Sequence, residues 1–264
     1  MTSMSMPIGQ IAKNLRAVRE RIAEACLRVA RDPREVTLVA VTKTFPLCYI
    51  QEAWEAGQRD FGENRPEEGA PKIEAMTRWL AEQEGGGATG CCRPTWHMIG
   101  HVQRRKAGLV VAHFDLVHSV DRLKLAQKLS RLALEADRQL PVLIECNVSG
   151  EVTKYGYQLA GWQERPELLQ SFVEEMAGLV ALSGLEVMGL MTVAPWLDDP
   201  EMVRPVFASL RALRDVLQER FPEVSWQHLS MGMSDDFEVA VEEGATMVRL
   251  GRAIFGPRPV SPGA

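Results

Sequence analysis

The chain has 264 residues, of which 46% are hydrophobic and 25% charged, with a formal net charge of −5. This composition is ordinary for a soluble globular protein and allows one large α/β domain or two small ones. The acidic balance argues against a nucleic-acid binder, no apolar run approaches a membrane span, and the first residues do not resemble a secretion signal. Five irregularly spaced cysteines indicate reduced thiols, so we expect a cytoplasmic protein.

Strand and helix patterns alternate along the chain. Strands are expected at 37–43, 60–64, 96–100, 116–120, 141–148, 185–193, 227–232 and 246–250, where short apolar runs lie between turn signals. Helices are expected at 11–29, 46–56, 67–82, from an Asp121 N-cap to about Arg138, at 201–221 and at 235–243. Eight strands alternating with helices predict a single (β/α)8 barrel over residues 1–264.

One segment departs from this pattern. Residues 81–95 are rich in glycine, which is typical of a flexible insertion. Cys91 and Cys92 are adjacent and lack the spacing of a metal or redox motif, so we favour a loop without chemistry there.

Lys43 ends the first buried strand, at 37–43. The carboxyl ends of the strands are where barrels of this kind carry their chemistry. An amine held partly out of water there is easier to deprotonate and can form a Schiff base with an aldehyde. A solvated lysine that merely closes a strand is the alternative.

Two further segments point to an anion at the same mouth. The run Ser230-Met231-Gly232-Met233-Ser234 follows a strand and precedes a helix, whose first amides have no partner within the helix. A capped helix, with Ser234 or Asp235 as N-cap, is the alternative.

The other segment is Arg249-Leu250-Gly251-Arg252, after the last strand, where barrels often bind phosphate. Gly251 offers an unobstructed amide, Arg252 could clamp phosphate, and Arg249 alternates with apolar neighbours and therefore points into the mouth. A rim arginine paired with a carboxylate is the alternative.

A lysine, a phosphate cradle and an arginine together suggest pyridoxal phosphate (PLP), and here the chain resembles a known family, the pyridoxal phosphate homeostasis proteins. The resemblance covers about residues 11–256. It is carried by VAVTK at 39–43, FGEN at 61–64, WHMIG at 96–100, HSVD at 118–121, KYG at 154–156, GLMT at 189–192, LSMGMSDD at 229–236 and RLGRAIFG at 249–256.

The resemblance implies a barrel like the N-terminal domain of alanine racemase, without that enzyme's second domain. It implies that Lys43 forms the Schiff base with PLP, that the 230–234 segment and Gly251-Arg252 bind its phosphate, and that Arg249 faces the pyridine nitrogen. Asn64 and Met191 would line the pocket. A cationic arginine disfavours protonation of the ring, which fits binding better than broad amino-acid catalysis.

Two positions depart from the family pattern. Arg252 stands where the family usually has threonine, so it either adds a charged phosphate contact or turns to solvent. The family's Gly-x-Leu-Gln-x-Asn-Lys pattern appears as GHVQRRK at 100–106, with Arg105 in place of asparagine. The role of that segment is therefore less safely transferred.

Three functions stay open. The first is a monomeric PLP carrier that limits free aldehyde and supplies apo-enzymes, without dedicated turnover. The second is a racemase-like PLP enzyme, which would need a second base. None of the three tyrosines, Tyr49, Tyr155 and Tyr157, has an obvious claim to that role, and a cysteine or histidine could replace it. The third is a Schiff-base aldolase that uses Lys43 without PLP.

We expect core or rim histidines at His97 and His101 rather than a metal pair.

Other polar and aromatic residues are expected to be structural. The acidic stretch 63–68, apart from Asn64, is typical of a solvated helix start. Trp162, Trp196 and Trp226 are expected to pack against the fold rather than line a ligand site.

Overall fold

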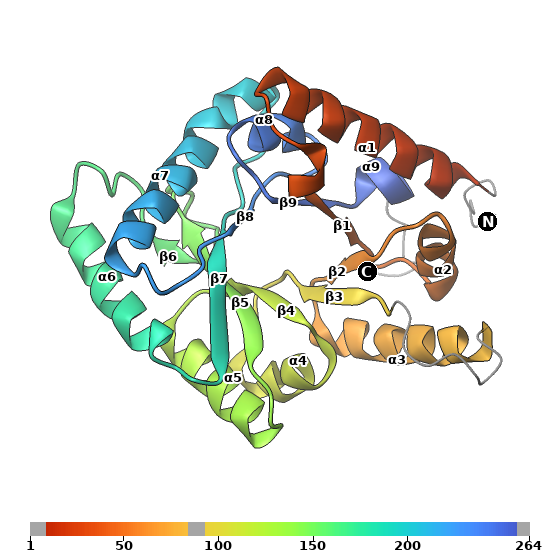
Figure 1. Cartoon of the computed structure of the whole chain (residues 1–264), viewed down its shortest axis with the longest axis horizontal. Coiled ribbons are helices and arrows are strands. Elements are labelled where there is room, and N and C mark those ends of the chain that lie inside the picture. Colours follow the sequence, from red (N-terminus) through yellow and green to blue (C-terminus); the bar gives the residue numbers. More distant parts are fainter. Residues whose placement is uncertain (1–8, 84–92, 258–264) are drawn as a thin grey trace.

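The computed structural model describes residues 9–83 and 93–257, and its strands form a closed parallel barrel surrounded by helices (Figure 1). Around the ring the order is β4–β3–β2–β1–β9–β8–β7–β5, and pairing of β5 with β4 completes it. The strands are Thr37–Val41 (β1), Asp60–Glu63 (β2), Thr95–Met98 (β3), Leu116–Val120 (β4), Leu140–Asn147 (β5), Leu185–Met191 (β7), His228–Ser230 (β8) and Met247–Leu250 (β9). The predicted (β/α)8 barrel is confirmed.

Helices connect the strands around the outside of the barrel (Figure 1). They are Gln10–Arg28 (α1), Leu47–Glu55 (α2), Pro66–Gln83 (α3), Ala107–His113 (α4), Leu123–Glu135 (α5), Pro166–Val180 (α6), Arg204–Arg220 (α7), Phe237–Glu242 (α8) and Arg252–Phe255 (α9). We did not predict α4 and α6 from the sequence. The buried residues of α6, Phe172, Met176 and Leu179, have the spacing of a helical face, so that signal was available.

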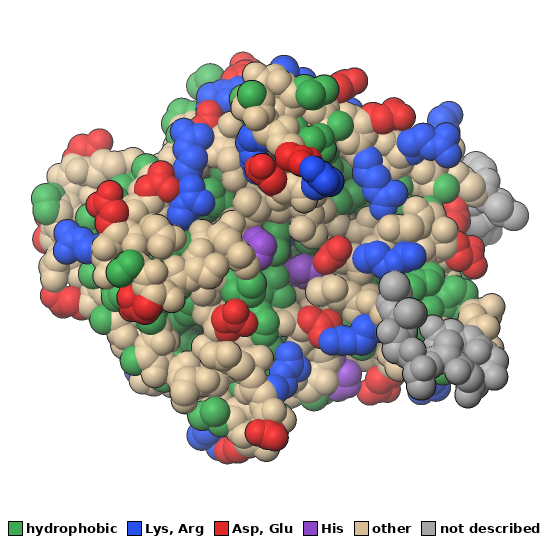
Figure 2. All heavy atoms as spheres, viewed as in Figure 1, with side chains coloured by type: hydrophobic (Ala, Val, Ile, Leu, Met, Phe, Trp, Pro, Cys, Tyr) green, Lys and Arg blue, Asp and Glu red, His purple; other side chains and the backbone are tan. Residues whose placement is uncertain are grey.

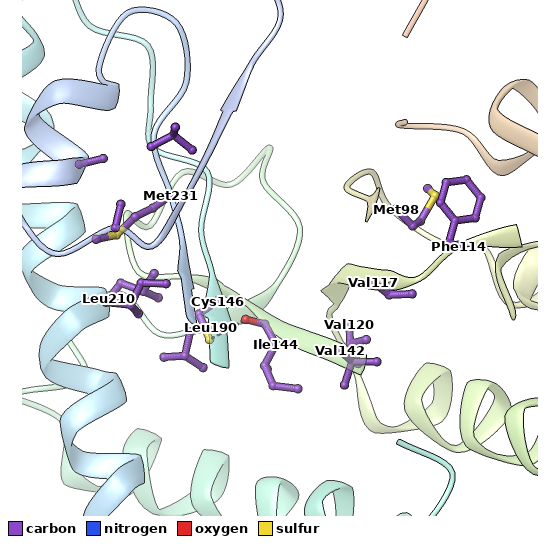
Figure 3. Packing of buried hydrophobic residues seen from close by; sticks show 14 of the residues in the cluster. Met98, Phe114, Val117, Val120, Val142, Ile144, Cys146, Leu190, Leu210 and Met231 are labelled. Carbon is purple, nitrogen blue, oxygen red and sulfur yellow. Dashed lines mark hydrogen bonds between the residues drawn. The ribbon is translucent and has the colours of Figure 1, made fainter. Parts of the chain in front are cut away.

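The two faces of each strand have different neighbours, because side chains alternate across a strand. Ile144 and Cys146 of β5 belong to the large outer core between strands and helices, where Leu190 of β7 lies near Leu210 of α7 (Figure 3). A smaller apolar cluster is formed by Leu116, Leu143, Met191 and Met247. The barrel is therefore a packed core, as close-packed interiors require.

The N-terminal and C-terminal parts of the chain meet at one seam. Strand β1 pairs with β9 from Thr37 opposite Met247 onward, and α1 packs against α8 and α9 outside them (Figure 1). The Asn14 side-chain amide donates to the Ile254 carbonyl at 2.8 Å, and the Arg21 and Glu238 side chains pair at 3.0 Å. Helix α1 thus covers the line where the barrel closes.

Several local expectations were wrong. Asp121 does not cap α5, whose N-cap is Arg122. The Asp121 carboxylate instead accepts hydrogen bonds from the Arg122 side chain at 2.5 and 2.7 Å. Neither Ser234 nor Asp235 caps α8, whose N-cap position is Asp236. Strand β1 ends at Val41, so Lys43 lies two residues beyond it, in a turn.

A short strand, β6 (Tyr157–Gln158), pairs with β5 in a second sheet. Cys91, Cys92 and most of the glycine-rich segment lie outside the described residues. Within 9–83 and 93–257, no helix is long and apolar enough to cross a membrane. The same residues contain no group of three or more His, Cys, Asp or Glu side chains that could hold a metal ion.

Gly100, just after β3, fixes the path of the chain after β2. A Cβ atom there would lie 2.3 Å from the backbone oxygen of Asn64, a contact that only backbone movement could relieve. Gly108, in α4, has open space around its own Cβ position.

We therefore expect Gly100→Ala to lower the free energy of unfolding by about 1–3 kcal/mol, as overpacking does. The matched Gly108→Ala change should raise it by about 0.5–1 kcal/mol, since alanine suits a helix better than glycine. Urea denaturation of both variants measures the difference. Equal effects of the two substitutions would contradict the close approach at Gly100.

Candidate functional site

All the predicted cofactor residues lie on one side of the barrel mouth. They come from the carboxyl ends of β2, β1, β9, β8 and β7, or from the chain just beyond them, and these strands are consecutive around the ring. Asn64 follows β2, Lys43 follows β1, and Met191 ends β7. Segments 230–234 and 249–252 fill the positions between. The site is thus an arc of adjacent strand ends.

Lys43 sits in a tight turn that is held from both sides. The Phe45 amide donates to the Thr42 carbonyl at 3.1 Å, which closes the turn. Thr44 has a left-handed backbone with φ of 68°, a strained conformation for a β-branched residue. Its amide donates to the Glu68 carboxylate at 2.5 Å. Lys43 itself is partly exposed.

A buried ion cluster beneath this turn explains its stability. The Lys72 ammonium donates to the Thr42 carbonyl at 2.8 Å, to Glu63 at 2.9 Å and to Glu68 at 2.8 Å. Glu63 also accepts from the Thr42 hydroxyl at 2.6 Å. The expectation that the acidic stretch is solvated was therefore wrong for Glu63, which is fully buried. Burial raises the pKa of Glu63, although Lys72 and Thr42 favour its charged form.

Arg249 lies inside the barrel, as the alternation of its strand predicted. Its guanidinium donates to the Ser230 hydroxyl at 2.6 Å and to the Thr192 carbonyl at 2.9 Å. Burial lowers the pKa of Arg249 to about 10, while the charges of Glu145 and Asp236 partly offset that effect. The side chain therefore remains a cation at neutral pH.

Several buried polar atoms of the described residues lack a hydrogen-bond partner, and two of them concern the predicted site. Asn64 Oδ1 and Glu145 Oε2 are buried and accept no hydrogen bond from any described residue. Burial raises the pKa of Glu145 to about 7, Asp121 adds to the increase, and Arg249 opposes it. Unsatisfied buried acceptors are costly, so they mark a place where a polar ligand gains hydrogen bonds.

The path of the loop after β8 requires glycine at position 232. Gly232 has φ of 97°, and a Cβ atom there would lie 2.7 Å from the Ala240 side chain. The Met233 amide donates to the Asp236 carboxylate at 2.5 Å, whereas the Ser234 and Asp235 amides bond to no other described residue. These two amides are therefore available to an anion.

The neighbouring loop after β9 places its two predicted residues differently. Gly251 is half-buried and lies close to Val41 of the adjoining strand. Arg252 is exposed and forms an ion pair with Asp235. The Arg252 side chain thus lies beside the loop after β8, and its contact with phosphate stays a prediction.

His97 and His101 have different partners. His97 is buried and bonded to His118 and Asp60, whereas His101 stacks on Tyr155 at the rim, with ring centroids 4.0 Å apart. Of the tryptophans, Trp162 and Trp226 are buried as expected, but Trp196 is 69% exposed, so its assignment to packing was wrong.

Sequence reasoning missed two buried polar residues, Glu145 and His118, and it expected His97 in the core or at the rim without identifying its partners. A signal existed, because each interrupts an otherwise apolar strand pattern, where a polar side chain requires a buried partner. Figure 2 shows histidine and hydrophobic side chains near the centre of the viewed face, while most Lys and Arg side chains lie closer to its edge.

The fold and this lysine–arginine arrangement define a class of barrel protein. The family model described as "Alanine racemase, N-terminal domain" matches residues 8–259. An alanine racemase of Clostridium difficile 630 has a similar structure, with a TM-score of 0.59 at 14% identity, over 94% of this chain and 58% of that one. This likeness concerns the fold alone.

Closer relatives narrow the class. The pyridoxal phosphate homeostasis protein of Escherichia coli K12 is 42% identical over 96% of this chain and 99% of that protein. Its counterpart in Aquifex aeolicus is 40% identical over 93% and 97%. PipY of Synechococcus elongatus, solved with PLP bound, matches with a TM-score of 0.76 at 32% identity, over 93% of this chain and all of that one. The chain therefore belongs to the pyridoxal phosphate homeostasis protein family.

The raised pKa of Glu145 predicts that the free energy of unfolding depends on pH. Its carboxyl would ionise near pH 4.5 in the unfolded chain but near 7 in the folded one, so its contribution falls as the pH rises from about 4.5 through 7. Relative to Glu145→Gln, wild-type protein should lose about 2–3 kcal/mol of unfolding free energy over this range.

Urea denaturation at pH 5 and pH 8 checks this expectation. Glu186→Gln, which changes an exposed carboxylate on β7, is the matched control and should follow the wild type. If the Glu145 variant and the wild type show parallel pH profiles, the raised pKa is refuted.

Proposed function

We propose that this chain binds PLP as a Schiff base on Lys43 and takes part in intracellular PLP homeostasis, holding the cofactor and supplying it to apo-enzymes. One observation carries the proposal. Lys43 follows strand β1 and Arg249 lies in the neighbouring strand β9, so an amine and a buried cation lie toward the same end of the barrel. A relative with this fold has been solved with PLP bound.

The residues present fit this cofactor. PLP offers an aldehyde, a phosphate dianion and a ring with hydrogen-bonding groups. Lys43 supplies a primary amine for the aldehyde. The free amides at Ser234 and Asp235, with the close approach allowed by Gly232, suit the phosphate. The unpaired Asn64 oxygen and the buried Met191 side chain complete a partly polar, partly apolar lining.

Arg249 determines what bound PLP can do. The cofactor's ring acts as an electron sink when its nitrogen is protonated. A guanidinium facing that nitrogen disfavours the added positive charge. The buried cation therefore supports storage of the aldehyde more than carbanion chemistry. This is the reason for proposing a carrier rather than a racemase.

The remaining parts of the proposal concern assembly and surroundings. We infer a single PLP-binding domain that acts as a cytoplasmic monomer. The residues proposed to bind the cofactor lie along one arc of adjacent strands of one barrel, which supports a site that a single barrel can form. The partners would be PLP and apo PLP enzymes.

The first test is the absorption spectrum of purified protein with added PLP, followed by borohydride reduction and peptide mass spectrometry. Lys43→Ala should lose the reduced adduct on the peptide containing residue 43. Lys124→Ala, an exposed lysine on α5, should keep the band and the adduct. Wild-type protein without an adduct at Lys43 would refute the assignment. Racemisation of alanine above the level of Lys43→Ala would contradict a carrier.

Arg249 should control the cofactor more than the fold. We expect Arg249→Gln to raise the pKa of the bound ring nitrogen by about one unit or more, because a nearby cation is lost. Arg249→Lys, which keeps a charge, should shift it less. Absorption spectra recorded across pH measure the shift, and circular dichroism monitors folding. An unchanged spectrum in the glutamine variant would make Arg249 a purely structural residue.

A further inference from the structure

A continuous chain of hydrogen bonds crosses the barrel interior and ends on Arg249. The guanidinium contacts the Ser230 hydroxyl at 2.6 Å, and that oxygen lies 2.8 Å from His118 Nδ1. His118 Nε2 lies 2.8 Å from His97 Nδ1, and His97 Nε2 lies 3.1 Å from the Asp60 carboxylate. Strands β4 and β8 are not neighbours in the ring, so the bond between Ser230 and His118 spans the interior.

Arg249 and Asp60, at the two ends of this series of hydrogen bonds, determine which partner donates in each bond. Arg249 can only donate, so the Ser230 oxygen accepts from it and turns its own proton to His118 Nδ1. His118 must then carry its proton on Nε2 and donate to His97 Nδ1. His97 in turn carries its proton on Nε2 and donates to Asp60, which as a carboxylate can only accept. Both imidazoles are neutral in this arrangement.

The reverse direction is unfavourable. It requires a proton on both nitrogens of His97, and it leaves Ser230 accepting from His118 and Arg249 with its own buried proton unpaired. It also places a second cation inside the barrel. Burial, followed by the charges of His97, Arg249 and His228, holds the pKa of His118 well below its usual value. Asp60, which is 28% exposed at its side chain, is the carboxylate that ends the chain.

We propose that His118 and Ser230 are positioning residues, which present a fixed acceptor to Arg249 and so orient the guanidinium toward the ring nitrogen of bound PLP. This inference rests on the proposed function. In this proposal the Ser230 hydroxyl bonds to Arg249 and His118, and the other residues of the 230–234 segment bind the phosphate.

The direction of the hydrogen bonds between Arg249 and Asp60 can be tested in protein without PLP. Two-bond proton–nitrogen spectra of histidine-labelled protein distinguish the two neutral tautomers from the cation, and with five histidines the signals can be assigned by substitution. We expect His97 and His118 both as the Nε2–H tautomer at pH 7. His118 found as the Nδ1–H tautomer, or titrating near pH 6.5, would overturn the proposed direction.

Variants test the effect on the cofactor. His118→Phe removes both the donor and the acceptor. It should shift the pH midpoint of the bound PLP spectrum by about one unit, the equivalent of one charged hydrogen bond. His118→Gln retains a donor and an acceptor and should restore most of the wild-type profile. The control is His113→Gln on α4, where the ring bonds to the Leu109 carbonyl and to Glu74.

The outcomes separate the two hypotheses. If wild-type protein forms no adduct with PLP, the proposed function fails, while the tautomer spectra still decide the direction of the chain. If PLP binds and folded His118→Phe keeps the wild-type pH profile, the positioning role is refuted and the proposed function stands. If His118→Phe does not fold, His118→Gln and the wild-type tautomers decide the matter.

Discussion

Burial of the Arg249 guanidinium inside a closed barrel is the constraint on which the surrounding structure depends. A buried cation is expensive unless its donors are satisfied and opposite charge lies nearby. Ser230 and the Thr192 carbonyl satisfy two of those donors, and Glu145 and Asp236 supply compensating charge. Strands that would otherwise be apolar therefore carry polar residues facing inward.

The lysine and the arginine are held by separate parts of the molecule. The turn carrying Lys43 is anchored from outside the ring, by Lys72 and Glu68 of helix α3. Arg249 is anchored from inside, through Ser230 and the opposite wall of the barrel. The residues named in the two supports are different. Their separation in the structure is a reason to treat the amine and the cation as independently adjustable.

Much of the fold and of the arc of site residues could be predicted, because both depend on local patterns. Apolar runs between turn signals marked the barrel strands, and the strand ends placed Lys43 and Arg249 at one mouth. What failed depends on which side chains meet in the folded protein, which local patterns do not specify. Glu63 looked solvated because its partner Lys72 belongs to a helix, and Asp121 looked like a cap although its carboxylate bonds to a neighbouring side chain.

The histidine chain was beyond sequence reasoning for the same reason. His97, His118 and Ser230 are separated by 21 and 112 residues along the chain, and only the closed ring brings them together. A buried polar residue in an apolar strand indicates that some partner exists, but it does not identify that partner. Trp196 is exposed, which shows that the aromatic character of a residue does not by itself predict that it is buried.

The seam between β1 and β9 has a consequence for biosynthesis. Lys43 is made early and Arg249 late, and their strands pair only when the ring closes. Contacts between such distant segments form slowly, since a long loop must be ordered first. A chain still on the ribosome can present the amine but lacks the strand that completes the site. Cofactor capture would therefore report that synthesis and closure of the barrel are complete.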